Sequence, residues 1–246
     1  MNYSIILPTL NEKNHIINLI SSIKKNFINK KNGYEIIVVD DNSEDGTIDV
    51  IKNELKKNKK IRLYVRNNKK RNLAKSINLG INKSKYENII WMDADFQHPP
   101  EYIKKIFKHM YKKDIVVFSR FLKKSIRYFD NKKMIKENNE NQSILFNKLC
   151  NFIFYKDITD YTSGYICIKK NIIKKIPLKG FYGEYFLSLM VVCKNKNFKI
   201  LELPFKEKTR KTGKSKTIDG SNLRYIVLCW NYAISIIFNF IKKTIY

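Results

Sequence analysis

The stretch NIIWMDADFQHPPEYIKKIFKHM, residues 88–110, contains the unit from which much of this chain is built. Residues 88–92 are expected to form a strand, and residues 89–92 are apolar without alternation, as in a strand that is covered on both faces. Residues 93–98 follow and are called the acidic turn below. Residues 100–112 then carry apolar side chains at helical spacing. The stretch therefore predicts one strand, one polar turn and one helix.

The same order repeats through the first 120 residues. We expect further strands at residues 3–7, 34–39, 61–65 and 114–119, and further helices at residues 13–29, 47–57 and 71–83. Repeated strand–helix units build parallel, right-handed sheets. The pattern predicts an α/β fold with a Rossmann-like, doubly wound, mostly parallel sheet and helices on both faces.

The second half of the chain is less regular. Residues 121–143 are rich in Lys and Asn and are expected to form a loop. Then follow an expected helix (144–155), a turn (160–164), a strand (165–168), a helix (183–194), a strand (198–205) and a basic loop (206–216). Residues 225–241 are apolar but shorter than the ~20 residues of a membrane span. We expect one domain over residues 1–220, and within residues 221–246 a helix that packs on the core or lies in a membrane surface.

Composition limits the environment and the partners. The chain has 246 residues, of which 49 are basic and 22 acidic, giving a net charge of +27. This charge favours a polyanionic partner, although a compositional bias toward Lys, Asn and Ile explains it equally well. Widely spaced cysteines and the absence of a signal peptide favour a reducing cytosol. The cysteines are Cys150, Cys167, Cys193 and Cys229.

The polar motifs follow the expected strands, where ligands bind in open α/β sheets. Residues 8–12 follow the first strand, residues 40–46 the second and residues 93–98 the fourth. Residues 40–46 suit either a capped turn or a nucleotide pocket. Asp93 and Asp95 point the same way, so they either face water or, with the Gln97 oxygen, bind Mg²⁺ or Mn²⁺.

The basic loop contains TGKSK, residues 212–216, which is not a Walker motif because Lys208 occupies the position of the first glycine. Its Arg210, Lys214 and Lys216 suit a diphosphate. A solvated basic loop is the alternative reading.

Together, PTLNE, VVDDNSEDGT, DADFQHPPE, FSR, DYTSGY and RKTGKSK resemble, in this order, the motifs of family 2 glycosyltransferases. The resemblance covers residues 2–220 and is strongest to the dolichol-phosphate mannosyltransferase branch. It implies a GT-A fold, a nucleotide-sugar donor, most often GDP-mannose, and a polyprenyl phosphate acceptor. It further implies a divalent cation, Mg²⁺ or Mn²⁺, and inversion at the anomeric carbon without a general base.

By position in these motifs, the resemblance implies the following site. The nucleotide and diphosphate would contact Pro8, Leu10, Glu12, Val39, Asp41, Asp93 and Ala94. The cation would bind Asp93, Asp95 and Gln97, and the groups at the reacting phosphates would be Asp95, Arg120, Arg210 and Lys216. This chain departs from the family at Leu10, where Tyr is usual, and at residues 71–77, where a Gly-Leu-Gly run is usual.

The resemblance also implies a protein that lies on the cytoplasmic face of an anionic membrane. Three alternatives remain: a related enzyme that uses a UDP-sugar such as UDP-glucose, a non-catalytic binding module, and a nucleic-acid-binding protein. Because the motifs gather at strand ends, where chemistry takes place, we expect no nucleic-acid partner.

Overall fold

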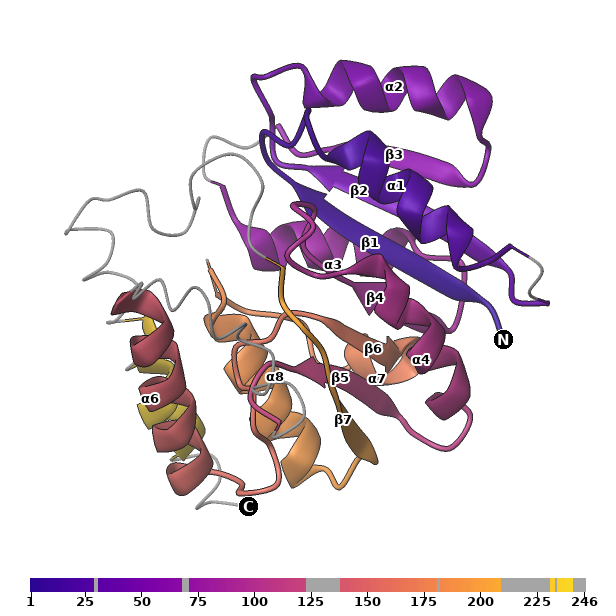
Figure 1. The fold of residues 1–246 in the computed structure, drawn as a ribbon. Helices are drawn as coiled ribbons and strands as arrows, with labels where there is room; N and C mark the ends of the chain where they lie inside the picture. The colour runs from indigo at the N-terminus through magenta and orange to yellow at the C-terminus, as the bar shows by residue number, and fades with distance from the viewer. Residues whose placement is uncertain are drawn as a thin grey trace, which may run out of the picture.

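A seven-stranded sheet with the order β3-β2-β1-β4-β6-β5-β7 runs through the molecule (Figure 1). The computed structural model describes residues 1–28, 31–67, 71–122, 138–180, 182–208, 231–232 and 234–240. The strands are β1 (Tyr3–Thr9), β2 (Tyr34–Asp40), β3 (Ile61–Val65), β4 (Asn88–Trp91), β5 (Ile115–Ser119), β6 (Ile166–Lys169) and β7 (Ile200–Pro204).

The helices alternate with the strands, as the periodicity predicts. They are α1 (Ile16–Lys25), α2 (Thr47–Lys57), α3 (Leu73–Lys83), the short 3-10 helix η1 (Pro100–Tyr102), α4 (Ile103–His109), α6 (Asn138–Ile153), α7 (Lys170–Ile173) and α8 (Glu184–Asn195). Residues 231–232 and 234–240 are also helical and are called the C-terminal helix below.

One strand runs against the others. β1, β2, β3 and β4 are parallel, and β5 and β7 are parallel, but β6 pairs antiparallel with both β4 and β5. The expectation of a mostly parallel sheet is confirmed. The reversal has a consequence for the site, because β6 begins at the edge of the sheet where β4 and β5 end.

The helices bury two hydrophobic cores, one on each face of the sheet. Leu19 of α1, Ile51 of α2 and Ile106 of α4 belong to one core. Ile77 of α3 and Phe186 of α8 belong to the other. Neighbouring residues of one strand contribute to opposite cores, which is why the strands are apolar without alternation.

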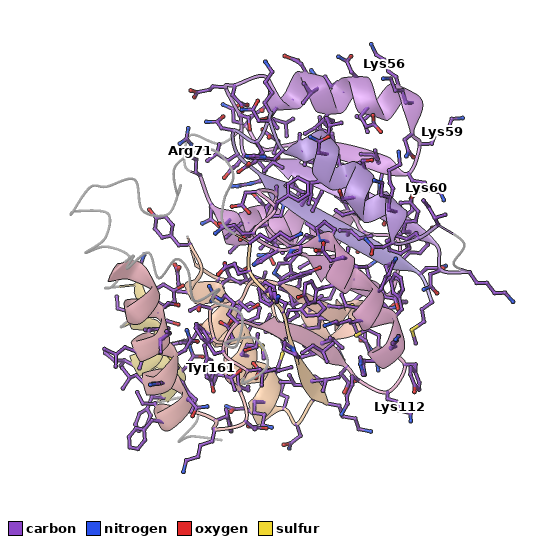
Figure 2. The ribbon with its side chains drawn as sticks, in the orientation of Figure 1. Lys56, Lys59, Lys60, Arg71, Lys112 and Tyr161 are labelled. Carbon is purple, nitrogen blue, oxygen red and sulfur yellow. The ribbon has the colours of Figure 1, made fainter. Side chains whose placement is uncertain are left out.

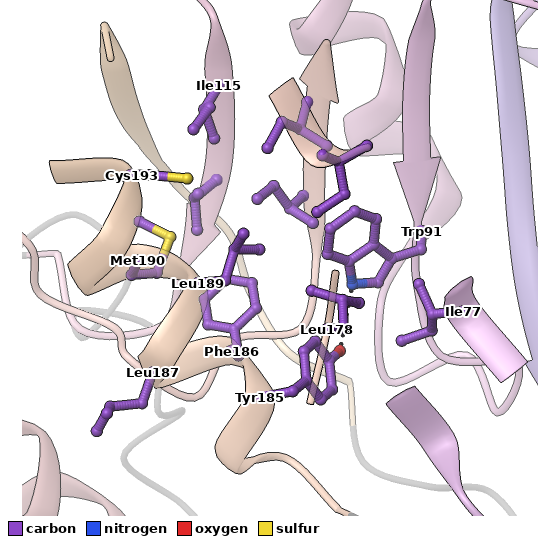
Figure 3. Close-up of a cluster of buried hydrophobic side chains, with 14 of the residues drawn as sticks. Ile77, Trp91, Ile115, Leu178, Tyr185, Phe186, Leu187, Leu189, Met190 and Cys193 are labelled. Atoms are coloured by element: carbon purple, nitrogen blue, oxygen red, sulfur yellow. Dashed lines mark hydrogen bonds between the residues drawn. The ribbon is translucent and has the colours of Figure 1, made fainter. Parts of the chain in front are cut away.

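The second core contains one buried polar contact. The Trp91 Nε1 donates a hydrogen bond to the Tyr185 hydroxyl over 3.2 Å. Both side chains are buried among the apolar side chains of α8 and the strands (Figure 3). Each polar group thereby gains a partner that it would otherwise lack in the core.

α3 approaches β1 very closely at Gly80. A Cβ atom at this position would lie 2.5 Å from the Cγ2 atom of Ile6. The close approach therefore depends on a residue without a side chain.

One segment differs from the sequence-based expectation. Residues 138–143, expected in a loop, form the first part of α6. The remainder of that expected loop includes residues 123–137, which lie outside the described residues.

The positive charge reaches distant parts of the surface. Lys56, Lys59 and Lys60 lie at the end of α2 and in the turn that follows it, whereas Lys112 lies beyond α4 at the opposite end of the molecule (Figure 2).

The C-terminal helix packs on the domain through polar side chains. Asn239 Nδ2 donates to the hydroxyl of Ser188 on α8 over 2.8 Å, and the hydroxyls of Ser188 and Ser235 lie 3.0 Å apart. Its Tyr232 ring also contacts the ring of Phe146 on α6. None of the helices in the described part of the chain is both long and apolar enough to cross a bilayer.

Candidate active site

The sequence-predicted nucleotide residues meet at the carboxyl ends of β1 and β2. In this parallel pair Pro8 lies opposite Val39, and the Asp41 N–H donates to the Thr9 carbonyl over 2.9 Å. β4 lies on the other side of β1, with Trp91 opposite Ile6. Strand register therefore brings Pro8, Val39 and Asp41 to the edge at which the acidic turn after β4 begins.

The first of the two adjacent aspartates after β2 builds the turn. Asp40 is fully buried, and its carboxylate accepts hydrogen bonds from the hydroxyls of Thr9 and Ser43 and from the Ser43 N–H, each over 2.7 Å. These bonds hold the end of β2 against the end of β1. Asp40 therefore positions the edge. The residue expected at the nucleotide is its neighbour Asp41, which is also buried.

Asp41 is held by an arginine that sequence reasoning missed. Arg66, just beyond β3, donates from Nη1 to Asp41 Oδ1 over 2.6 Å and to the Ser76 hydroxyl over 2.9 Å. The Asn72 N–H donates to Asp41 Oδ2 over 2.7 Å. Burial raises the pKa of Asp41 above its ordinary value, and the bonds from Asn72 and Arg66 oppose this rise.

Arg66 is itself buried, and its Nη2 atom is buried without a hydrogen-bond partner among the described residues. A buried arginine is rare unless it is paired. The one sequence signal was its place: it is one of seven arginines in a chain of 49 basic residues and follows a strand.

The turn after β1 is locked to the turn after β2. Asn11 has φ of 53°, a left-handed conformation that Asn tolerates. Its N–H donates to the Ser43 hydroxyl over 2.8 Å, and its side-chain oxygen accepts from the Glu44 N–H over 2.9 Å. The N–H of buried Glu12 donates to the Thr47 hydroxyl over 2.8 Å. Leu10, directly before Asn11, is half-buried.

The acidic turn presents its two aspartates differently. The Asp93 side chain is 47% exposed, whereas Asp95 is buried and its Oδ1 accepts from the Gln97 N–H over 3.0 Å. Ala94 between them is buried. The exposed carboxylate can therefore meet a ligand from solvent, while the buried one is fixed by the turn.

His98 fixes this turn through the backbone of Asp93. Its Nδ1 accepts from the Asp93 N–H over 3.0 Å, so the proton of the neutral ring lies on Nε2. The ring is buried and stacks on Tyr165. Burial lowers the pKa of His98, which keeps the ring neutral at physiological pH.

The turn offers oxygen ligands of the kind that Mg²⁺ and Mn²⁺ prefer, namely two carboxylates and the Gln97 amide. The described residues contain no group of three or more His, Cys, Asp or Glu side chains that could hold a metal ion. A cation here would therefore take further ligands from outside the protein, such as water and phosphate oxygens.

Arg120, expected to face a phosphate, lies at the same edge, directly after β5. Its Nε and Nη2 donate to the two oxygens of Asp160 over 2.9 and 3.0 Å, and Nη2 also donates to the Thr162 hydroxyl over 2.7 Å. Asp160 is fully buried. It precedes β6, so the reversed direction of that strand is what brings it to the site.

The Arg120–Asp160 pair remains ionised. Burial alone would raise the pKa of Asp160, but Arg120 holds it below its ordinary value. Burial would likewise lower the pKa of Arg120, but Asp160 raises it. The Nη1 atom of Arg120 lies 3.7 Å from a Glu207 carboxylate oxygen, which is beyond ordinary hydrogen-bond distance.

The start of the basic loop is bonded to the acidic turn and to the helix that follows it. The Lys206 N–H donates to the Tyr102 hydroxyl, and the Lys208 N–H donates to the Gln97 carbonyl, each over 3.1 Å. Lys208 Nζ also donates to Glu101 over 2.7 Å. Arg210, Lys214 and Lys216 lie outside the described residues.

Residues 4–177 match the model of the protein family described as glycosyl transferase family 2. The chain belongs to glycosyl transferase family 2. The resemblance carried by the motifs at the strand ends is thereby confirmed.

Two curated relatives of this family 2 glycosyltransferase are named dolichol-phosphate mannosyltransferase. The one from Pyrococcus furiosus is 29% identical over 92% of this chain and 62% of its own length. The one from Saccharomyces cerevisiae is 32% identical over 48% of this chain and 45% of its own length. The chain thus spans less than two thirds of the length of these relatives.

Solved structures show the same fold at low identity. A glucosyl-3-phosphoglycerate synthase from Mycobacterium tuberculosis, in complex with Mn²⁺, UDP and phosphoglyceric acid, superimposes with a TM-score of 0.70 at 13% identity. The match covers 97% of this family 2 glycosyltransferase and 78% of that chain. A structure of that enzyme with Mg²⁺ and UDP gives a TM-score of 0.62 at 15% identity, covering 87% of this chain and 72% of that chain. The expected GT-A fold is confirmed.

Proposed function

We propose that this chain transfers mannose from GDP-mannose to a polyprenyl phosphate, with inversion at the anomeric carbon. Family membership supports a sugar transfer, and the name of the P. furiosus relative supports mannose as the sugar and a dolichol-type phosphate as the acceptor. A lipid acceptor would place the chain at the cytoplasmic face of a membrane.

One observation carries the proposal: the described start of the basic loop is bonded to the acidic turn through Lys208 and Gln97. Arg210 follows Lys208 by two residues, a stretch of chain no longer than about 7 Å. The acidic turn and the basic loop would then form a clamp, in which Arg210 and Lys216 close over the diphosphate that the turn holds.

In this proposal Asp93, Asp95 and Gln97 hold Mg²⁺ or Mn²⁺. The solved neighbours that contain Mn²⁺ or Mg²⁺ together with UDP support a cation in this fold. The bound cation would supply positive charge to the leaving diphosphate. On the nucleotide side, Pro8, Leu10, Glu12, Val39 and Asp41 would line the pocket, with Ala94 beside the diphosphate.

The reaction requires no base from the protein. A phosphate monoester with a second pKa of about 6 is largely dianionic at neutral pH, so its oxygen attacks the anomeric carbon without losing a proton. As the new C–O bond forms, the bond to the nucleoside diphosphate breaks and the diphosphate leaves with the electron pair. A single displacement turns an α-linked donor into a β-linked product. A reaction that needs no base from the protein agrees with His98, which is buried and neutral and holds the turn.

Arg120 would bind the acceptor phosphate from the other flank of the site. Asp160 holds one edge of its guanidinium, through Nε and Nη2, and fixes the plane. A fixed arginine binds phosphate with less loss of side-chain entropy than a free one.

A UDP-sugar donor is the second candidate. The solved neighbours with UDP favour it, and Leu10 stands where the mannosyltransferase branch usually has Tyr. With UDP-glucose the same site would produce a lipid-linked glucose phosphate by the same displacement.

The test is a donor screen with the full chain. Radiolabelled GDP-mannose and UDP-glucose are each incubated with a polyprenyl phosphate in detergent, with Mg²⁺, with Mn²⁺ or with a chelator. We expect label to enter the lipid phase from GDP-mannose only when a cation is present, and the product to be the β anomer by NMR.

Asp95→Asn should abolish this transfer, and Asp49→Asn, an exposed acid on α2, is the matched control that should leave it unchanged. Transfer from UDP-glucose alone would select the second candidate. Transfer that persists in Asp95→Asn would refute the role of the acidic turn, and no transfer from either donor would refute both candidates.

A further inference from the structure

The C-terminal helix has its polar and apolar sides reversed. Ser235 and Asn239, which face α8, are 9% and 1% exposed. Ile234 and Ile237 are 49% and 60% exposed. A helix that lies between a protein core and water shows the opposite arrangement. The outer side of this helix therefore suits a medium that is less polar than water.

α6 extends this surface. Leu145, Leu149 and Phe152 form one stripe at helical spacing and are 70%, 48% and 81% exposed. The two helices touch where the rings of Phe146 and Tyr232 lie 4.8 Å apart, and they lie side by side in Figure 1. We call the exposed set the apolar face: Leu145, Leu149, Phe152, Ile234, Ile237, Phe238 and Phe240.

The apolar face is concentrated rather than scattered. It holds seven of the ten large hydrophobic side chains that are exposed among the described residues. Single exposed hydrophobic residues are ordinary, but a contiguous group marks an interaction surface.

Most of the charges beside this face are positive. Lys148 on α6 and Lys156 in the turn that follows are both exposed, and the acid of that turn, Asp157, is paired with Lys194. Residues 231–240 contain no charged residue. With the net charge of +27, the face complements a negatively charged surface.

We propose that the apolar face docks on the surface of a lipid bilayer that contains anionic lipids. The proposal rests on the proposed function, because a polyprenyl phosphate is a membrane lipid. The residue types also favour lipid, since the face consists of Leu, Ile and Phe, whereas protein interfaces are enriched in Tyr, Trp, Met and Arg as well. Apolar helix faces of this kind lie in the boundary between headgroups and acyl chains.

The inner side of α6 connects the docked face to the site. Asn147, buried on that side, donates to the Thr162 hydroxyl over 3.0 Å and accepts from the Tyr161 N–H over 2.6 Å. Thr162 in turn accepts from Arg120. A helix with its side chains is about 10 Å thick. Docking would therefore bring Arg120 within about one helix diameter of the bilayer surface, where it can reach a lipid phosphate.

Vesicle flotation with the full chain tests the proposal. The probes are vesicles of phosphatidylcholine alone and of phosphatidylcholine mixed with phosphatidylglycerol, each at low and high salt. We expect the protein to float with the mixed vesicles, and more weakly at high salt because salt screens the charges. The double variant Leu145→Ser, Phe152→Ser should bind at least tenfold more weakly, because two large apolar side chains no longer enter the bilayer.

Tyr111→Ser, beyond α4, is the matched control: Tyr111 is 60% exposed but lies outside the apolar face, so its loss should not change binding. Binding of the nucleoside diphosphate in solution, without lipid, should be unchanged in all variants and reports that they are folded.

The outcomes separate this proposal from the proposed function. Vesicle binding that depends on the face, without sugar transfer in the donor screen, would support docking and refute the transferase. Transfer to polyprenyl phosphate in detergent, without vesicle binding at low salt, would overturn docking alone. Docking would also be overturned if the double variant bound vesicles as well as the parent protein, or if the face instead formed a dimer in light scattering.

Discussion

Arg120 and Asp160 form a two-point ion pair between the end of β5 and the turn before β6, with Nε and Nη2 donating to the two carboxylate oxygens over 2.9 and 3.0 Å. The pair joins segments 40 residues apart. Because Asp160 is fully buried, it keeps its charge through this contact, the N–H groups of Arg120 and Thr162, and the Thr162 hydroxyl. The pair therefore fixes the flank of the site on which we place the acceptor.

The first prediction concerns this pair and pH. Asp160→Asn should lower the free energy of unfolding by about 3 kcal/mol at neutral pH, because it leaves Arg120 without its buried partner. Arg120 lowers the pKa of Asp160 in the folded protein, so this contribution is present above the ordinary Asp pKa of about 3.9 and is lost as the pH falls below it. The difference in the free energy of unfolding between variant and parent should thus become smaller at acidic pH. Urea unfolding at several pH values would measure it.

Asp157→Asn is the control, three residues away. Its carboxylate is 62% exposed and pairs with Lys194 at the surface. The substitution should therefore lower the free energy of unfolding by less than about 1 kcal/mol at every pH. A loss in Asp160→Asn that is constant with pH would show that the ion pair is not its cause.

The second prediction concerns Arg66, which holds Asp41. Arg66→Met should raise the KM for the sugar nucleotide about tenfold or more with little change in kcat, since a charged hydrogen bond contributes roughly 1.5–3 kcal/mol. The Arg66 charge opposes the rise in the pKa of Asp41, so its removal raises that pKa further. When the pH is lowered, donor binding to the variant should therefore begin to weaken at a higher pH than donor binding to the parent protein.

Arg66→Lys keeps the charge and should keep the pH profile close to that of the parent. Arg62→Met is the control on β3, because Arg62 pairs with Glu35 and not with Asp41. An equal rise in KM for Arg62→Met and Arg66→Met would point to a general loss of structure.

The third prediction concerns His98, which acts on Asp93 through the backbone. His98→Phe keeps the stacking on Tyr165 but leaves the Asp93 N–H without its acceptor. We expect a 10–100-fold increase in the Mg²⁺ or Mn²⁺ concentration that gives half-maximal transfer, as for other groups that orient metal ligands.

His98→Asn offers an acceptor in place of Nδ1 and should recover part of the loss. His109→Asn at the end of α4 is the control. An unchanged cation dependence in His98→Phe would argue against a role of His98 in the turn.

The fourth prediction concerns the contact between α3 and β1. Gly80→Ala should improve helix propensity by about 1 kcal/mol, but its Cβ would lie 2.5 Å from Ile6. Overpacking of this kind costs roughly 1–3 kcal/mol. We therefore expect the variant to unfold at a lower urea concentration than the parent protein. Asn82→Ala on the exposed side of α3 is the control and should be neutral or stabilising. A stabilised Gly80→Ala would mean that β1 and α3 move apart easily.

Much of the fold followed from local pattern. The boundaries of β3 at Ile61–Val65 and of α2 at Thr47–Lys57 were predicted to the residue, because each apolar run has a clear start and end. The direction of β6 could not be read in this way. A run such as YICI has no polarity of its own, and its direction depends on how the segments before it cross the sheet.

The missed features depend on contacts between distant residues. Asp41 and Arg66 are 25 residues apart, and nothing near Arg66 in the sequence shows its partner. Likewise α6 begins at Asn138, before its apolar pattern starts at Ile144, because polar residues form its first turns. The expected residues 8, 39, 41, 93 and 95 come from strand ends, where parallel register places them together without any long-range information.

The two flanks of the site come from two successive parts of the chain. The ends of β1, β2 and β4 come from the first 101 residues, whereas Arg120, Asp160 and the anchored Lys208 come from the stretch beyond. Each flank thus has its own continuous segment of polypeptide. Splicing a foreign segment after η1 would replace one flank of the site while leaving the opposite flank intact, so hybrids of related chains offer a direct way to vary the two flanks one at a time.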